Sequence, residues 1–428
     1  MVLVVATSMA ALIPNLFDAQ PASATGTVFG AGTFIANTSA LTLTGPSLSI
    51  TGVKQSGIAV FKFGNVTVPS GTTITAVGSR PFELVATGNL VIGGAITSDG
   101  VSATANAAGP NAGGAGGGAG GTDGTTAGGG TGGGGHASVA RNGGGGGGFA
   151  APGAPGGFSV TGTVGAGGAS YGSLDLALQG GSGGAGGTTG SNTVGGGGGG
   201  GASGLFGATV TIQSTAAIVA TGGNGNGGND GASGGGSGGG IILHGTTVRI
   251  DGVLVATGGN GGTGGCCGDG GGGSGGRIEV QYKAFSSRGT MVTVVAGGTS
   301  GTSGPDAHGG LSADPTGGAG IVSFTHIDAS LLSIGPSRSV AKGATVSVAT
   351  KLTDGGTGSG IAKASVGLYR HLATGGPWKL AATKMTSAGG QAVASVKVTA
   401  SAQYEWRFAG ALVHDPGNSS IQSLLVKK

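Results

Sequence analysis

The chain has little charge and few aromatic side chains. Of its 428 residues only 8% are charged and 4% are aromatic, whereas 109 are glycine. Ordinary domains carry about 25% charged residues and about 7% glycine. So much glycine without a strict three-residue period excludes collagen and is typical of low-complexity or fibrous structure. Because the apolar residues gather in short strand-like runs, we expect an ordered scaffold with glycine-rich segments rather than disorder throughout.

Cysteine is almost absent. Cys266 and Cys267 are adjacent and lie beside Asp269, so no disulfide framework holds the fold together. A vicinal disulfide, an intermolecular cross-link, a free pair and a metal site all stay open for these two residues. Two thiolates without a nearby histidine make the metal site the weakest of these options. We therefore predict no bound metal.

Clustered catalytic or nucleic-acid-binding residues are also missing. The six histidines stand at no metal-ligand spacing, and acids such as Glu83, Asp251 and Glu279 are isolated along the chain. Matches to G-x-G-x-x-G carry no information in a glycine tract because no helix follows them. The net charge of +4 is scattered, with no basic stripe among aromatic residues. We expect no enzymatic activity, no cofactor and no nucleic-acid partner.

The first residues have the pattern of an export signal. An apolar run from Val2 to Ile13 is too short to span a bilayer, and Ala22-Ser23-Ala24 offers small residues at a cleavage position. No Lys or Arg precedes the run. We interpret residues 1–24 as a signal peptide and expect a secreted or extracellular protein, with association with the cell surface left open. We expect no membrane span in the mature chain.

A repeat organises the middle of the chain. Strand-like blocks begin at Leu205, Ile241 and Arg277, 36 residues apart, and the phrase VATGGNG recurs at Val219 and Val255. A fixed period of this size is typical of a solenoid, in which each unit buries its apolar face against its neighbours. Residues 27–100 add alternating strands, and no long helical pattern follows residue 24. We therefore predict an all-β protein in which residues 25–328 form a parallel β-solenoid or β-helix.

Long polyglycine-type loops leave this predicted solenoid at residues 101–204, 222–240 and 258–276. Glycine loses the most conformational entropy on ordering, so such tracts taken alone behave as flexible linkers. The alternative is packed glycine helices of polyproline II type, in which the missing side chain lets backbones approach closely. The sequence leaves both readings open.

The unit of two strands followed by glycine resembles the glycine-rich β-solenoid repeats of secreted bacterial surface proteins. The segments that carry the resemblance are PFELVATGNLVIGGAI, residues 81–96, and GGIILHGTTVRIDGVLVATGG, residues 239–259. The unit is also loosely similar to the glycine-helix sandwiches of some phage tail-tip adhesins. Both likenesses cover roughly residues 58–325 and imply no ligand-binding residue.

Residues 329–428 predict a second domain. Seven short alternating strands in about 100 residues are what an immunoglobulin-like β-sandwich requires. In the last aromatic run, Tyr404, Trp406 and Phe408 fall on one face of the expected strand. The seven strand-like runs are LLSI, TVSVATKLTD, KASVGLYRHL, WKLAATKM, QAVASVKVTA, AQYEWRFAG and SSIQSLLVKK.

This second domain resembles the immunoglobulin-like modules of secreted actinobacterial proteins. The matching features are Leu368-Tyr369-Arg370, Trp378, the turn from Thr386 to Gly390, and the strand from Tyr404 to Phe408. The resemblance implies a stalk, spacer or adhesion role and no catalytic residue.

These observations predict a secreted or cell-surface structural or adhesive protein without catalytic activity. Its expected partners are cell-surface polysaccharide or other surface proteins, and its oligomeric state is open. One alternative is a carbohydrate- or ice-binding module that uses Thr209, Thr211 and Thr247 on the strands, and regular threonine columns would favour it. A weaker alternative is a polysaccharide-active β-helix enzyme, which would need clustered carboxylates on one face.

Overall fold

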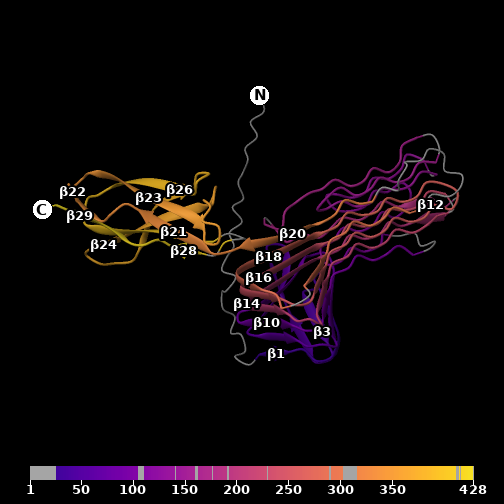
Figure 1. Cartoon of the computed structure of the whole chain (residues 1–428), viewed down its shortest axis with the longest axis horizontal. Helices are drawn as coiled ribbons and strands as arrows, with labels where there is room; N and C mark the ends of the chain where they lie inside the picture. The colour runs from indigo at the N-terminus through magenta and orange to yellow at the C-terminus, as the bar shows by residue number, and fades with distance from the viewer. Residues whose placement is uncertain are drawn as a thin grey trace. The chain divides into compact units, whose positions relative to one another are not determined.

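The computed structural model describes residues 26–104, 110–139, 141–159, 162–175, 177–189, 192–228, 230–288, 291–301, 316–410, 414 and 416–427. Within them the chain is all-β and contains no helix, as Figure 1 shows. They form two compact units, residues 26–325 and residues 326–427. The predicted signal peptide at residues 1–24 lies outside the described residues.

The first unit contains a ten-stranded sheet, here sheet A, whose long strands are parallel. Its main order is β1-β7-β10-β14-β16-β18-β20, and β9 joins β14 to the pair β6 and β5. Its strands are β1 (Thr27–Val28), β5 (Val53–Gln55), β6 (Ile58–Phe63), β7 (Val66–Val68), β9 (Phe82–Ala86), β10 (Asn89–Ile92), β14 (Ala202–Ile212), β16 (Gly240–Ile250), β18 (Arg277–Ser286) and β20 (Ile321–His326).

A second sheet of eight strands, here sheet B, lies in the same unit. Its order is β19-β17-β15-β11-β8-β2-β3-β4, parallel from β19 to β2 and antiparallel through β3 and β4. Its strands are β2 (Gly32–Asn37), β3 (Thr42–Gly45), β4 (Leu48–Thr51), β8 (Thr72–Val77), β11 (Ala95–Thr97), β15 (Ala217–Val219), β17 (Val253–Val255) and β19 (Val292–Val294).

One hydrophobic core joins the two sheets. In β14 and β16 the residues that alternate inward, such as Val210, Ile212, Val248 and Ile250, are fully buried, because successive side chains of a strand point to opposite faces. Parallel neighbours place like residues against each other, as in the pairing of Leu205 with Leu243. We call this part of the first unit the strand stack.

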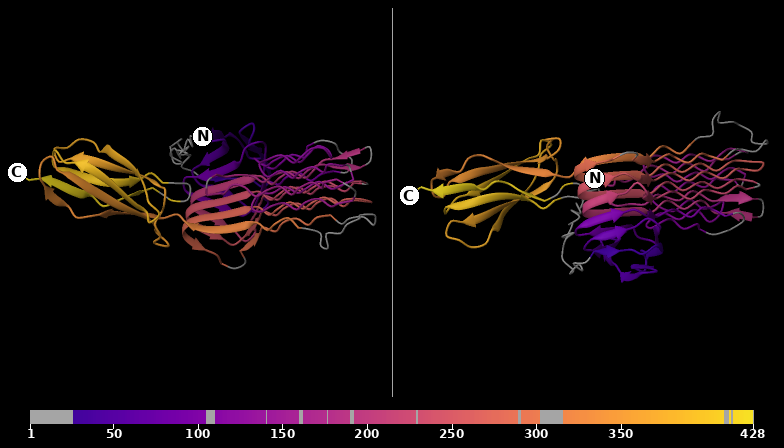
Figure 2. Two further views of the ribbon diagram at one scale, coloured as in Figure 1. Left: turned by 90° about the horizontal axis from the view of Figure 1, so that it is seen from above. Right: turned by 60° about the horizontal axis from the view of Figure 1, so that its bottom comes forward.

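The glycine-rich segments leave the strand stack after β11, β15, β17 and β19 and return to the next strand of sheet A. They comprise the described parts of residues 98–201, 220–239, 256–276 and 295–320, and we call them the glycine arm. Both views of Figure 2 show these segments running side by side. One short hairpin interrupts them, formed by β12 (Gly187–Thr189) and β13 (Asn192–Val194).

Hydrogen bonds in the glycine arm follow a three-residue period. Along residues 232–239, every third amide donates to the same neighbouring segment. The three sets of acceptors are the carbonyls of Gly268, Gly271 and Ser274, those of Asn226, Gly223 and Ala220, and those of Ala185 and Ser182. Three residues per turn is the period of a polyproline II helix. These tracts are therefore packed glycine helices, not free loops.

Close backbone approach explains why the arm needs glycine. A Cβ atom on Gly236 would lie 2.1 Å from the carbonyl oxygen of Gly198, and one on Gly223 would lie 2.2 Å from that of Val101. Both distances are well inside van der Waals contact, and the obstructing atoms are backbone. The interior of the arm is thus filled by main chain and by small side chains such as buried Ser233 and Ser237.

The repeat of 36 residues read from the sequence is correct for one pair of strands and shifted for others, since the offset between β17 and β19 is 39 residues. Val219 pairs with Val255 between β15 and β17, which is the expected offset of 36 residues. Between β14 and β16, however, Thr209 pairs with Thr247, an offset of 38 residues. The corner from sheet A to sheet B is two residues longer after β14 than after β16. Since strands alternate with period two, the shift leaves the buried face unchanged.

The second unit contains two further sheets around its own core. A three-stranded antiparallel sheet has the order β21-β23-β26, and a six-stranded sheet has the order β22-β29-β27-β24-β25 with β28 beside β27. Tyr404, Trp406 and Phe408 are buried between them. The strands are β21 (Ala329–Ile334), β22 (Arg338–Val340), β23 (Thr345–Asp354), β24 (Ser365–Leu372), β25 (Lys379–Met385), β26 (Gln391–Lys397), β27 (Ala402–Phe408), β28 (Gly417–Asn418) and β29 (Gln422–Val426).

Candidate functional site

The three threonines singled out in the sequence lie on the outer face of sheet A. Thr209 and Thr247 are direct partners on adjacent strands, but Thr211 is paired with Arg249. The row that contains Thr209 and Thr247 continues to Asn89 on one side and Ala284 on the other. The structure therefore brings two of the three threonines together without extending them into a column.

Sheet B does not contain a longer threonine column than sheet A. Thr33 pairs with Thr73, and Thr75 pairs with Thr97, but alanine, valine and isoleucine occupy the neighbouring outward positions. Among the described strand pairings of both sheets, a threonine column spans at most two adjacent strands. The regular array that would favour an ice-binding surface is not formed by these residues.

An open polar groove lies beside Thr211, at the corner between the two sheets. It has a volume of about 320 Å³. The Nη2 atom of Arg249 lies 2.5 Å from Oδ2 of Asp251, and the backbone amide of Arg288 donates to Oδ1 of Asp251 at 2.6 Å. These contacts, with the Arg288 amide first, hold the pKa of Asp251 below its usual value. The groove is lined by Thr211, Gln213, Ser214, Thr215, Arg249 and Asp251.

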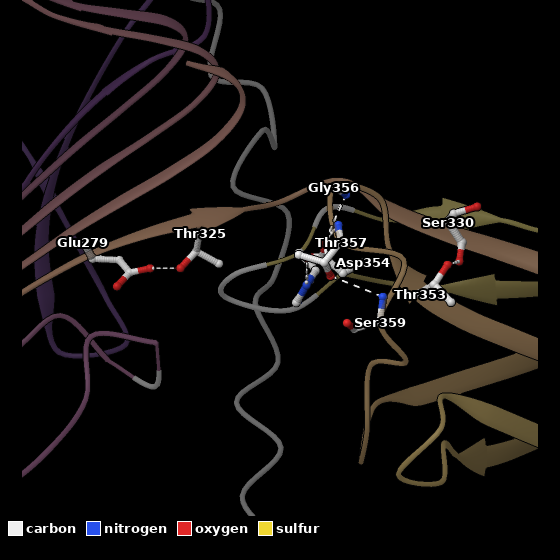
Figure 3. Close-up of polar contacts among 9 residues, drawn as sticks. Glu279, Thr325, Ser330, Thr353, Asp354, Gly356, Thr357 and Ser359 are labelled. Atoms are coloured by element: carbon white, nitrogen blue, oxygen red, sulfur yellow. Dashed lines mark hydrogen bonds and ion pairs between the residues drawn. The ribbon is translucent and has the colours of Figure 1, made fainter. Parts of the chain in front are cut away.

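Two buried carboxylates occupy one row across sheet A. Glu83 on β9 and Glu279 on β18 are separated by β14 and β16 and are 8% and 3% exposed. Burial raises the pKa of Glu83 to about 7, against the opposing charge of Lys62. Burial also raises the pKa of Glu279, although hydrogen bonds donated by the hydroxyl of Thr325 (Figure 3) and by that of Ser323 oppose this shift.

The spacing of these carboxylates does not fit glycoside hydrolysis. Three interstrand steps separate Glu83 from Glu279, which places their strand positions about 14 Å apart. Retaining and inverting glycosidases hold their two carboxyl groups about 5 to 9.5 Å apart, so that both reach one glycosidic bond. Glu83 and Glu279 therefore do not form the pair that a β-helix hydrolase would need.

The adjacent cysteines lie in the glycine arm with their sulfurs bonded to each other. Cys267 is buried, and Asp230 brings a carboxylate oxygen within 4.8 Å of both sulfurs. The guanidinium of Arg141 lies 3.8 Å from that carboxylate and 3.8 Å from the Cys266 sulfur. Because the joined sulfurs offer no thiolate and a cation lies against the carboxylate, this arrangement does not fit a metal site.

Asp269, which follows the cysteines in the sequence, lies in a different environment from Asp230. It is buried, and its backbone carbonyl accepts a hydrogen bond from the amide of Gly157 at 2.7 Å. The carboxylate near the sulfurs comes from the preceding glycine tract instead. Sequence proximity pointed to the wrong aspartate, since neighbouring tracts pack side by side in the arm.

In the second unit, Asp354 closes a turn. Its Oδ1 atom accepts hydrogen bonds from the amides of Gly356 and Thr357 at 3.0 and 2.7 Å (Figure 3), and its Oδ2 atom lies 3.3 Å from Nε2 of His414. Burial acts to raise the pKa of Asp354, but the hydrogen bonds from Thr357 and His414 outweigh it and hold the pKa below its usual value. These contacts stabilise the turn that follows Asp354 and indicate a structural role for its carboxylate.

An aromatic cluster covers the outer side of β24 and β27. The guanidinium of Arg407 lies 4.5 Å from the ring centre of Tyr369 and 5.3 Å from that of Trp378, and His371 stacks on Trp378. Arg407 also contacts Glu405 at 2.7 Å. The resemblance to immunoglobulin-like modules rested partly on Tyr369 and Trp378, and here both support Arg407.

Comparison with known protein families finds no matching family model, and a search of curated proteins finds no significant relative. Among the described residues, no helix is long and apolar enough to cross a membrane.

Proposed function

We propose that the protein is a secreted or cell-surface structural and adhesive protein without catalytic activity or a cofactor. In this proposal the strand stack and glycine arm form a glycine-rich parallel β-solenoid, and the second unit is an immunoglobulin-like sandwich that acts as a spacer or docking module. The resemblances to secreted bacterial surface proteins and actinobacterial modules support both assignments.

The observation that carries the proposal is the packed glycine arm. Its interior is held by backbone hydrogen bonds between tracts, as along residues 232–239, and few of its described ionisable groups are buried. A bundle of this kind is stiff, because each backbone is fixed by several neighbours. Its chemistry is suited to presenting a surface rather than to acid–base or nucleophilic catalysis.

Protease shaving of intact producing cells tests the location, and attachment of cells to a polysaccharide-coated surface tests the role. We expect the protein in the culture medium or among the shaved peptides, and we expect weaker attachment after its gene is deleted. Recovery only from the cell interior would refute the surface role. Hydrolysis of a polysaccharide by the pure protein would refute the absence of catalysis.

Carbohydrate binding at the polar groove is a second candidate, favoured by the groove of about 320 Å³ beside Thr211. Hydroxyl, amide and charged groups converge there, as they do in many sugar sites. Replacement of Gln213 by Ala should then weaken binding to a glycan array, with Thr67→Ala on β7 as the control outside the groove. The short threonine columns do not favour ice binding, which a thermal hysteresis measurement would test.

A further inference from the structure

The formal charge of the chain is divided between its two parts. Residues 326–428 contain eleven Lys and Arg against four Asp and Glu, a net charge of +7. Residues 1–325 contain eight basic and eleven acidic residues, a net charge of −3. The basic residues, which seem scattered along the whole sequence, are thus concentrated in the second unit.

A groove in the second unit gathers three of these cations. It has a volume of about 360 Å³ and lies where β25 and β26, from different sheets, approach each other. None of its lining residues is acidic. They are Arg370, Lys379, Leu380, Ala381, Ser395, Val396, Lys397 and Tyr404.

Two of the cations face each other directly. Arg370 on β24 is the cross-strand partner of Lys379 on β25, and like charges at such positions destabilise a sheet. On its other side Arg370 is paired with Tyr404, whose hydroxyl forms a hydrogen bond with Arg370 but brings no compensating charge. Among the described residues of this unit, Glu405 pairs with Arg407 and Asp354 with His414, so neither of these ion pairs involves Arg370 or Lys379. A bound anion would relieve this repulsion.

We propose that this groove binds an anionic polysaccharide, a glycan chain that carries carboxylate or sulfate groups. The inference rests on the proposed surface role and names the class of partner. A recessed groove between two strand edges admits a narrow chain and not the plane of a membrane. Nucleic acid is disfavoured because Tyr404 is only 2% exposed and offers no face for base stacking.

The test measures binding of the full chain to polygalacturonate, dextran sulfate and neutral dextran by biolayer interferometry. The groove variant carries Arg370→Gln, Lys379→Gln and Lys397→Gln. A matched control carries Arg338→Gln, Lys342→Gln and Lys351→Gln, which removes the same charge from elsewhere in the unit. The polygalacturonate and dextran sulfate arms distinguish a carboxylate from a sulfate ligand.

We expect salt-sensitive binding to at least one anionic polymer and none to neutral dextran. The groove variant should bind at least about tenfold more weakly, because three charge contacts are lost, and the control should bind within about threefold of the parent. Equal losses in both variants, or no binding to either anionic polymer, would overturn the proposal.

One further variant and one further experiment keep the outcome interpretable. Lys397→Gln alone removes an exposed strand-end charge and should weaken binding even if the triple variant fails to fold. The shaving experiment separates the two proposals, since loss of polymer binding in a protein that still reaches the cell surface refutes the groove and leaves the surface role standing.

Discussion

The strand stack and the glycine arm bury their interiors by opposite means. In the stack, the core consists of large side chains such as Phe34, Leu84 and Leu243, and the two sheets close around them. In the arm, tracts approach until glycine backbones touch, and amides donate in three directions to neighbouring tracts. The first interior is stabilised mainly by apolar burial and the second mainly by satisfied backbone hydrogen bonds.

This difference predicts opposite responses to a change in side-chain size. The stack should lose stability when side-chain atoms are removed, because a cavity replaces packed side chains. The arm should lose stability when atoms are added, because its backbones already lie in contact.

The largest effect is expected from Leu243→Ala. Leu243 is fully buried in the core of the first unit, and the substitution should lower the free energy of unfolding of that unit by about 4 kcal/mol. Chemical denaturation of the full chain, followed by a probe of the first unit, measures the change. Val53→Ala, at a side chain that is 44% exposed, is the control and should cost less than about 1 kcal/mol. A mild effect of Leu243→Ala would contradict a packed side-chain core.

The buried carboxyl group of Glu83 should make the stability of the strand stack depend on pH. The pKa of Glu83 is raised from 4.5 to about 7 in the folded state, so its stabilising contribution is fully present below pH 4.5 and is lost as the pH rises through 7. The free energy of unfolding of the parent should fall by about 3 kcal/mol between pH 4.5 and pH 7, and Glu83→Gln should abolish this fall. Thermal unfolding at pH 4.5 and pH 8 measures the difference.

The matched control for this titration is Glu405→Gln, which removes a carboxylate from the second unit and should leave the pH profile of the first unit unchanged. Parallel profiles for the parent and Glu83→Gln would show that the Glu83 carboxylate is not buried in solution.

In the arm, Gly236→Ala should lower the stability of the first unit by about 2 kcal/mol, since the added carbon meets the Gly198 carbonyl oxygen. Gly389→Ala is the control, because a Cβ there meets only a hydroxyl at 4.0 Å. Circular dichroism melts of both variants provide the measurement. An arm that accepts alanine at position 236 without loss would not be a packed bundle.

The smallest effect lies in the second unit, outside both interiors. Asp354→Ala should lower the stability of that unit by about 1 kcal/mol at neutral pH, through loss of the contacts with Thr357 and His414. Because the folded-state pKa is depressed, the contribution is present above 3.8 and is lost as the pH falls through the folded value. A pH titration of the unfolding free energy should show the parent and the variant converging in acid.

Much of the fold could be predicted from the sequence. Alternation of apolar residues identified the strands of both units, and the phrase VATGGNG gave the correct offset between Val219 and Val255. Between β14 and β16 the predicted offset of 36 residues was two residues too short, because corner length does not show in an apolar pattern. Whether the glycine tracts pack could not be decided, since glycine gives the same local signal in a linker and in a bundle.

The candidate sites were less predictable. Asp251 was interpreted as isolated, yet Arg249, two residues earlier, folds back onto it at the corner of the sheets. The basic groove brings Arg370, Lys379 and Lys397 together from three strands, and only strand pairing reveals it. Counting charges by domain would have shown the basic second unit from the sequence alone.

The stiffness proposed for this protein depends on the glycine arm being a packed, hydrogen-bonded bundle. Residue-resolved amide hydrogen exchange on the full chain tests it most directly. We expect strong protection along residues 232–239, comparable to that of β14 and β16, because each amide there donates to a neighbouring tract. Exchange of these amides at the rates of an unfolded chain, with the strands still protected, would contradict it.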